Sequence, residues 1–152
     1  MLNRLKDVFA SFERHDVHYV VIGGIAAILY GVPRATFDLD ILIDPTPQNA
    51  QRLLQALLSA GLGTAALTNA DELLANEITV FTDRVRIDVQ TSTPGLQFAD
   101  AWRQRETMTF EDQKFFVACK TDLVASKKAA GRAVDLEDVR LLELPGSSSD
   151  RD

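Results

Sequence analysis

Two aspartates separated by a single residue, Asp38 and Asp40, lie on the apolar run Asp-Leu-Asp-Ile-Leu-Ile. Side chains alternate faces along a β-strand, so both carboxylates would project from one face while Leu39 and Ile41 point to the other. Carboxylates held side by side repel each other, and a divalent cation that binds their oxygens relieves that repulsion. The pair therefore predicts a site for a divalent metal ion.

A third carboxylate, Asp88, is predicted on a neighbouring strand. Residues 77–82 and 85–90 are two β-rich runs separated by Asp83 and Arg84, a pattern typical of a hairpin. Alternation in the second run puts Asp88 on the polar face, where it can join Asp38 and Asp40. Three converging carboxylates can hold two Mg²⁺ or Mn²⁺ ions roughly 3.5–4 Å apart, the arrangement that stabilises the attacking and leaving oxygens in phosphoryl or nucleotidyl transfer.

A glycine pair, Gly23 and Gly24, follows the apolar run of residues 19–22. A glycine turn that leads into a helix offers unpaired backbone N–H groups to an anion, and the missing side chains permit a close approach. Together with the carboxylates, this turn indicates a metal-bound triphosphate, and thus an NTP as substrate.

The order of these features resembles the DNA polymerase β-type nucleotidyltransferase superfamily. The shared features are a strand, the glycine pair, a helix, Arg34-x-Thr36-x-Asp38-x-Asp40 and a later aspartate on a strand. Within the superfamily, the chain is most similar to the short bacterial branch of AbiEii-type toxins and minimal nucleotidyltransferases. Residues 119–139 are also similar to this branch, with a lysine-bearing helix followed by an arginine and an acidic helix start. The resemblance covers most of the chain.

The resemblance implies an enzyme that moves a nucleoside monophosphate from an NTP to a hydroxyl acceptor. The acceptor would be an RNA end, a protein side chain or a small molecule, and the protein would belong to a toxin–antitoxin system. Asp38, Asp40 and Asp88 would be the catalytic residues and the ligands of two Mg²⁺ or Mn²⁺ ions. The predicted nucleotide-binding residues are Gly23, Gly24, Arg34, Thr36, Lys120, Lys127, Lys128 and Arg132.

A second reading stays open beside the enzyme. An Asp-x-Asp at a strand end can be merely solvated, and a lysine-rich helix is often a solvated face. The chain would then be a non-catalytic module of a toxin–antitoxin pair that binds a nucleotide or a partner. Lys127 and Lys128 are equal candidates for the phosphate contact, and the base of the NTP and the acceptor stay open. Because only about 30 residues follow the last predicted strand, we expect a homo-oligomer or a protein partner to complete the acceptor site.

Composition limits the classes of protein that the chain can belong to. With 152 residues, 46% of them hydrophobic and 25% charged, it is long enough and apolar enough for one globular domain. The net charge of −6 argues against broad, charge-driven binding to nucleic acid. The single cysteine, Cys119, fits a reducing compartment, and no apolar run reaches membrane-spanning length, so we expect a cytoplasmic protein without a membrane partner.

Hydrophobic periodicity predicts an α/β (α+β) fold, a small mixed β-sheet flanked by helices as in nucleotidyltransferases. We expect a single nucleotidyltransferase-like domain over residues 1–144 and a disordered tail over 145–152. Strands are predicted at residues 19–22, 39–43, 78–90 (as a hairpin), 107–110 and 114–117. Helices are predicted at about residues 3–15, 24–30, 48–60, 70–76, 98–105, 120–129 and 135–143.

Overall fold

A computed structural model describes residues 1–145, and its strands form one mixed sheet in the order β3-β4-β2-β1-β6-β5. Within the sheet, β1 runs parallel to β6 and β2 parallel to β4, whereas β1 and β2, β3 and β4, and β5 and β6 are antiparallel pairs. This architecture confirms the predicted fold class. The strands are β1 (Tyr19–Ile22), β2 (Asp38–Ile43), β3 (Ile78–Thr82), β4 (Arg86–Gln90), β5 (Glu106–Phe110) and β6 (Gln113–Val117).

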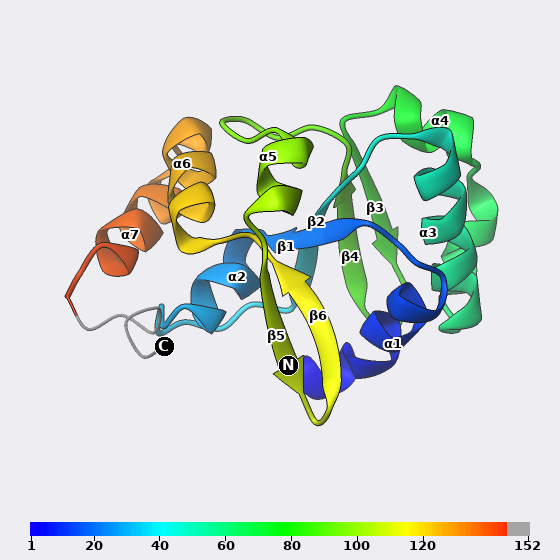
Figure 1. The fold of residues 1–152 in the computed structure, drawn as a ribbon, viewed down its shortest axis with the longest axis horizontal. Coiled ribbons are helices and arrows are strands. Elements are labelled where there is room, and N and C mark those ends of the chain that lie inside the picture. Colours follow the sequence, from blue (N-terminus) through cyan, green and yellow to red (C-terminus); the bar gives the residue numbers. More distant parts are fainter. Residues whose placement is uncertain (146–152) are drawn as a thin grey trace.

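The helices flank this sheet, with α1, α3 and α4 gathered at one end of the molecule and α6 and α7 at the other (Figure 1). None of the helices in residues 1–145 combines the length and the hydropathy needed to span a bilayer. The α-helices are α1 (Lys6–Arg14), α2 (Gly23–Leu29), α3 (Pro47–Ser59), α4 (Ala70–Ala75), α5 (Phe98–Arg103), α6 (Lys120–Ala130) and α7 (Ala133–Leu142), with short 3₁₀ turns at Leu2–Arg4 and Gly63–Leu67.

Local chemistry explains where the helices begin and end. The Thr46 side chain accepts a hydrogen bond from the backbone N–H of Asn49, and Pro47 occupies the first turn of α3, where no N–H is needed. At the other end of the chain, α6 ends at Gly131, whose φ of +69° is the left-handed conformation that glycine adopts most easily. The predicted helices are therefore found close to their predicted limits, because these stop and start signals are local.

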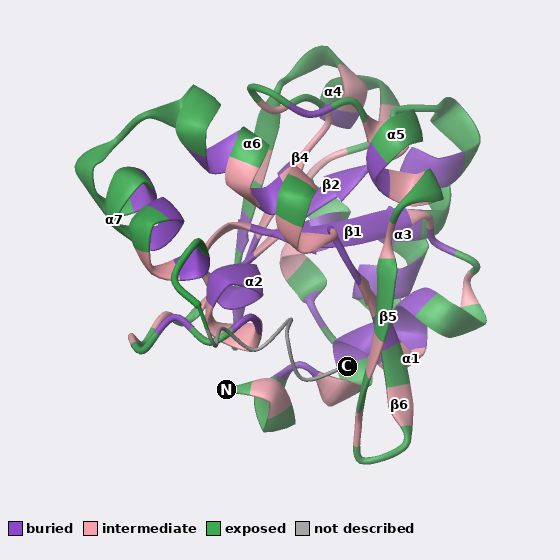
Figure 2. Ribbon diagram, turned by 60° about the vertical axis from the view of Figure 1, so that its left-hand side comes forward, coloured by how far each residue is buried: buried purple, intermediate pink, exposed green. Residues whose placement is uncertain are grey.

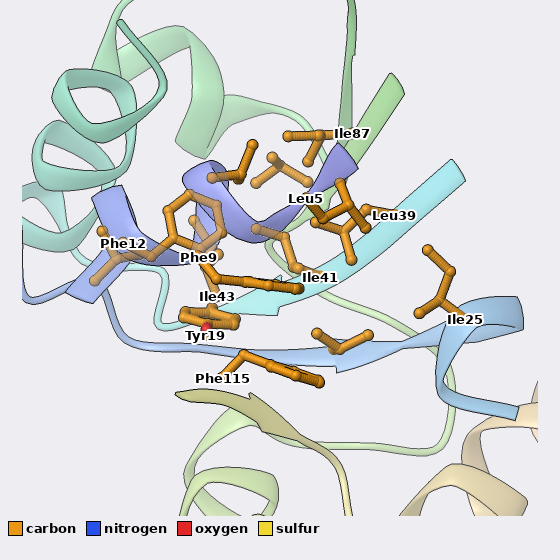
Figure 3. Packing of buried hydrophobic residues seen from close by; sticks show 14 of the residues in the cluster. Leu5, Phe9, Phe12, Tyr19, Ile25, Leu39, Ile41, Ile43, Ile87 and Phe115 are labelled. Carbon is orange, nitrogen blue, oxygen red and sulfur yellow. The ribbon is translucent and has the colours of Figure 1, made fainter. Parts of the chain in front are cut away.

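The larger hydrophobic cluster lies on one face of the sheet. Its aromatic part joins α1 to the sheet, with the ring centroids of Phe9 and Phe115 4.5 Å apart and those of Phe12 and Tyr19 4.8 Å apart (Figure 3). The strands β1 and β2 at the centre of the sheet are mostly buried (Figure 2). Alternate side chains of β2, namely Leu39, Ile41 and Ile43, are fully buried in this cluster. Their burial fixes the register of β2 and turns Asp38 and Asp40 to the opposite face.

The opposite face of the sheet is only partly covered. A smaller cluster of Val20, Ile22, Leu42, Leu96, Ala101 and Ala118 lies there, with Phe98 and Trp102 of α5 packed against it. This leaves the stretch of β2 and β4 that carries aspartates open to a pocket. The predicted disordered tail falls, from residue 146 onward, outside the described residues.

Candidate active site

The pairing of β2 with β4 brings the aspartates of the two strands side by side. The parallel register sets Asp40 opposite Asp88 and Asp38 opposite Arg86. The residue between the two polar residues of each strand, Leu39 in β2 and Ile87 in β4, is fully buried on the other face. The two strands thus present three half-buried carboxylates on one face of the sheet.

The electrostatics of Asp40 reflect this crowding. Burial, which disfavours the charged form, and then the neighbouring carboxylates of Asp88 and Asp38 raise the pKa of Asp40 to about 7, against a smaller lowering effect of Lys127. A carboxylate whose ionisation is opposed in this way gains from a nearby positive charge. The site therefore favours a cation beside Asp40.

The two glycines leave room for this arrangement. Gly23 has a φ of +71°, and a Cβ there would collide with the Asp40 carboxylate. A Cβ at Gly24 would lie 3.0 Å from the guanidinium of Arg34 and 3.2 Å from the methyl group of Thr36. Position 23 thus requires glycine, both for its backbone conformation and because the Asp40 carboxylate lies so close. At position 24, glycine leaves space for the side chains of Arg34 and Thr36.

Arg86 contacts two of the three carboxylates. Its guanidinium donates to both oxygens of Asp88, at 2.9 and 3.2 Å, and its Nε lies 3.7 Å from Asp38. In residues 1–145, no three His, Cys, Asp or Glu side chains are grouped so as to hold a metal ion in the present arrangement. Carboxylate oxygens from two adjacent strands are the ligands that a divalent cation such as Mg²⁺ prefers, and a cation would relieve the raised pKa of Asp40. The donor set fits such a cation once the Asp88 carboxylate turns away from Arg86.

A buried ion-pair cluster faces these strands from α6 and α7. Lys127, 4% exposed, places its Nζ 2.8 Å from Asp138 and 3.6 Å from Asp135. Asp138, 1% exposed, also accepts two hydrogen bonds from Arg34, at 3.1 and 2.8 Å, and Asp135 accepts from Arg132 at 2.7 and 3.2 Å. Burial raises the pKa of both aspartates, but their hydrogen bonds to Arg34, Lys127 and Arg132 outweigh it and hold each pKa below the usual range.

The sheet and the two helices enclose a cavity of about 240 Å³, here called the aspartate pocket. Lys127 and Arg132 are its cationic walls, and Asp40, Asp88 and Asp135 are its acidic ones. The pocket is lined by Ile22, Gly23, Asp40, Ile78, Asp88, Gln90, Thr93, Pro94, Ser126, Lys127, Ala130, Arg132 and Asp135.

The other predicted nucleotide-binding residues lie at different depths. Arg34 is held by Asp138, and Thr36 approaches Gly24 from the segment before β2. Lys128 is exposed and pairs with Glu143 at 3.1 Å, so of the two candidate lysines only Lys127 lines the aspartate pocket. Lys120 stands at the first position of α6, seven residues before Lys127.

Sequence reasoning missed two residues of the site. Arg86 shares the polar face of β4 with Asp88 because the two are separated by one residue, a spacing that could have indicated the contact. Asp138 belongs to the acidic helix start that follows Arg132 in the sequence, a pattern that by itself indicates no contact with the site. Its partner Arg34 is 104 residues away in sequence, and no local pattern reports such a contact.

The sequence and the fold of the chain are both similar to those of nucleotidyltransferases. A family model described as "Nucleotidyltransferase of unknown function (DUF6036)" matches residues 2–148. A crystal structure of a "putative nucleotidyltransferase" from Thermotoga maritima is similar in fold, with a TM-score of 0.58 and 16% identity over 92% of this chain and 90% of that one. No curated protein sequence matches the chain. The family model confirms the predicted nucleotidyltransferase family and the solved structure confirms the fold, whereas the closer relation to AbiEii-type toxins stays a prediction.

Proposed function

The chain belongs to the family of nucleotidyltransferases of unknown function (DUF6036), and on this premise we propose that it transfers a nucleoside monophosphate from an NTP to a hydroxyl acceptor in a reaction that depends on Mg²⁺ or Mn²⁺. One observation carries the proposal. Asp40 and Asp88 stand opposite each other on adjacent strands, in a pocket whose remaining walls include Gly23, Lys127 and Arg132. A pocket that joins carboxylates to cations suits a metal-bound triphosphate.

In the proposed reaction, Asp38, Asp40 and Asp88 would hold the divalent cations. The cations, when bound, neutralise charge on the phosphates and lower the pKa of the acceptor hydroxyl. For Asp88 to serve, its carboxylate must leave the guanidinium of Arg86, which now donates to both of its oxygens. Arg86 therefore competes with the cation for the same oxygens.

Lys127 and Arg132 would bind the triphosphate, since they are the cations that line the aspartate pocket. Gly23 keeps the β1–α2 turn close to Asp40. The acceptor oxygen attacks the α-phosphorus and forms a new P–O bond, while its proton passes to Asp88. The bond from the α-phosphorus to the oxygen bridging to the β-phosphate breaks, and pyrophosphate leaves with that electron pair.

Transfer of α-³²P label from each of the four NTPs tests the proposal. The acceptors are total RNA, dialysed cell protein and the enzyme itself, as well as small metabolites, with Mg²⁺ or Mn²⁺ present. We expect label with the wild type and with Asp100→Asn, a control at an exposed aspartate that pairs with Arg103 three residues on, and none with Asp40→Asn. If no label moves and calorimetry detects no metal-dependent NTP binding, the proposal is wrong and a partner-binding role replaces it.

Association with a second copy or with a toxin–antitoxin partner stays a prediction. Light scattering coupled to size-exclusion chromatography measures the first directly. A monomer at micromolar concentration would contradict it.

A further inference from the structure

A second cavity, here called the Trp102 pocket, lies beside the aspartate pocket and is the larger of the two, at about 450 Å³. It opens where β2 and β4 end and α5 begins. Its lining residues are His18, Leu42, Asp44, Pro45, Thr91, Ser92, Thr93, Leu96, Gln97, Phe98, Ala99 and Trp102. A volume of this size is typical of pockets for small ligands.

The two pockets lie on the same face of the sheet and share a wall. Thr93 lines both of them. Leu42, at the Trp102 pocket, is two residues beyond Asp40 on β2 and points to the same face, which separates them by about 7 Å along the strand. A ligand in the Trp102 pocket thus lies within reach of a phosphate bound at Asp40.

The chemistry of the two linings differs. Within the described part of the chain, no lysine or arginine lines the Trp102 pocket, whereas Lys127 and Arg132 line the aspartate pocket. The charged group among its walls is instead the carboxylate of Asp44. An RNA end would bring a negative phosphate with each nucleotide into a pocket that has no cation to pair with it.

The remaining walls suit a ring that carries hydroxyl groups. His18, Phe98 and Trp102 form an aromatic side of the pocket; the rings of His18 and Trp102 stack with their centroids 4.6 Å apart, and the Arg105 guanidinium lies 3.7 Å from the Trp102 centroid. Polar groups of Thr91, Ser92, Thr93 and Gln97 supply hydrogen-bond donors and acceptors. Aromatic side chains combined with neutral polar groups and the carboxylate of Asp44 bind a compact, uncharged or cationic polyhydroxylated molecule better than a polyanion.

We propose that the Trp102 pocket binds the acceptor, and that the acceptor is a small, uncharged or cationic molecule with a hydroxyl-bearing ring. This inference rests on the proposed nucleotidyl transfer and narrows its acceptor to one class. The nucleoside of the NTP has the same hydroxyl-bearing ring chemistry, but the aspartate pocket provides it with apolar walls of its own at Ile22, Ile78 and Pro94. The acceptor oxygen enters from the Trp102 pocket and bonds to the α-phosphorus as its proton passes to Asp88, and pyrophosphate leaves toward Lys127 and Arg132 with the electron pair of the broken P–O bond.

Two variants test the assignment without touching the aspartates. Ser92→Arg and Gln97→Arg each place a long cationic side chain at an exposed position of the Trp102 pocket, and Thr109→Arg places one on β5, away from both pockets. The acceptors are a cell-metabolite ultrafiltrate below 1 kDa, total RNA and dialysed protein, each supplied with α-³²P NTP and Mg²⁺. NTP affinity is measured in parallel by calorimetry.

With the wild type, we expect label in the metabolite fraction. Ser92→Arg and Gln97→Arg should each reduce this label transfer at least tenfold, whereas Thr109→Arg should not reduce it. NTP affinity should stay within twofold of wild type in all three variants. Label in RNA or protein alone overturns the proposal, and so does transfer to metabolites that both pocket variants leave unchanged. A loss of NTP affinity in the pocket variants also overturns it, because the pocket would then hold the nucleoside. Absence of both label and NTP binding in the wild type defeats the proposed transfer itself.

Discussion

Asp40 on the sheet and Asp135 and Asp138 on α7 are all largely buried, yet their pKa values are shifted in opposite directions. Asp40 has its pKa raised to about 7, because burial and two neighbouring carboxylates oppose its charge. Asp135 and Asp138 have theirs lowered, because Arg34, Lys127 and Arg132 more than offset their burial. The charges of Asp135 and Asp138 are thus satisfied within the protein, whereas the charge of Asp40 is opposed there and favours a cationic ligand. The difference separates residues that build the site from residues that act in it.

The largest effect should come from the sheet aspartates. We expect Asp40→Asn to reduce nucleotidyl transfer at least about a hundredfold, since the loss of a metal ligand removes several kcal/mol of stabilisation from the transition state. Thermal unfolding should show no loss of stability, because the substitution removes a charge that the fold does not pair. Initial rates of label transfer and a melting curve on the same sample measure both. A variant that unfolds early would break the distinction between the two regions.

The α7 aspartates should show the reverse. Asp138→Asn leaves Arg34 and Lys127 without their shared carboxylate, and truncating one partner of a buried ion pair costs about 3–5 kcal/mol of unfolding free energy. Urea denaturation measures this loss, and the exposed pair variant Asp100→Asn is the matched control, expected to change stability by less than about 0.5 kcal/mol. If Asp138→Asn proves as stable as wild type, the cluster does not hold α7 in place.

The stability of the folded protein should depend on pH in opposite ways through Asp40 and through the α7 aspartates. A raised pKa means that the folded metal-free protein binds the Asp40 proton more tightly than the unfolded chain does, so stability should fall as pH rises from about 4 to about 7, by about 1–3 kcal/mol. Asp40→Asn should remove that decline. The lowered pKa values of Asp135 and Asp138 act oppositely: their contribution is present above the ordinary aspartate pKa and is lost as pH falls below it, through the lowered pKa values of the folded protein. Chemical denaturation at several pH values tests both, and a wild type whose stability climbs from pH 5 to 8 would contradict the first.

The smallest effect concerns Arg86, which is 47% exposed, so that solvent screens its ion pairs with Asp88 and Asp38. We expect Arg86→Ala to tighten Mn²⁺ binding by about two- to fivefold, because the cation no longer competes with a guanidinium for Asp88. Calorimetric titration of Mn²⁺ into the metal-free protein measures the change, with Arg103→Ala on α5 as the control. Weaker binding would show that Arg86 orients the carboxylates rather than competing for them.

The sequence was sufficient for the parts of the molecule that depend on local signals. Alternation along β2 placed Asp38 and Asp40 on one face, and the β4 pattern placed Asp88 on the same face; the parallel register brings these strands together. The glycines, the capping residues and the apolar stripes likewise act over a few residues. For that reason the fold class and the strand limits could be predicted.

Contacts between distant segments could not be predicted in this way. Nothing near Asp138 in sequence indicates that it receives Arg34 and Lys127, and the spacing of Lys127 and Lys128 could not distinguish the lysine that faces Asp138 from the one that pairs with Glu143. The Trp102 pocket is likewise assembled from three loop or strand ends and a helix. Such features arise from the packing of whole elements, which a single sequence does not encode in any short pattern.

The ion pair between Arg34 and Asp138 also determines how late in protein synthesis Arg34 can find its partner. The two residues are 104 positions apart, so at about 5–20 residues per second a ribosome needs roughly 5–20 s after Arg34 to add its partner. Until then the nascent chain carries the glycine turn and all three strand aspartates, but lacks the anchor that Lys127 and Arg34 share. The side chain of Arg34 therefore cannot be held by Asp138 until α7 has been synthesised, so this contact forms late in the making of the chain.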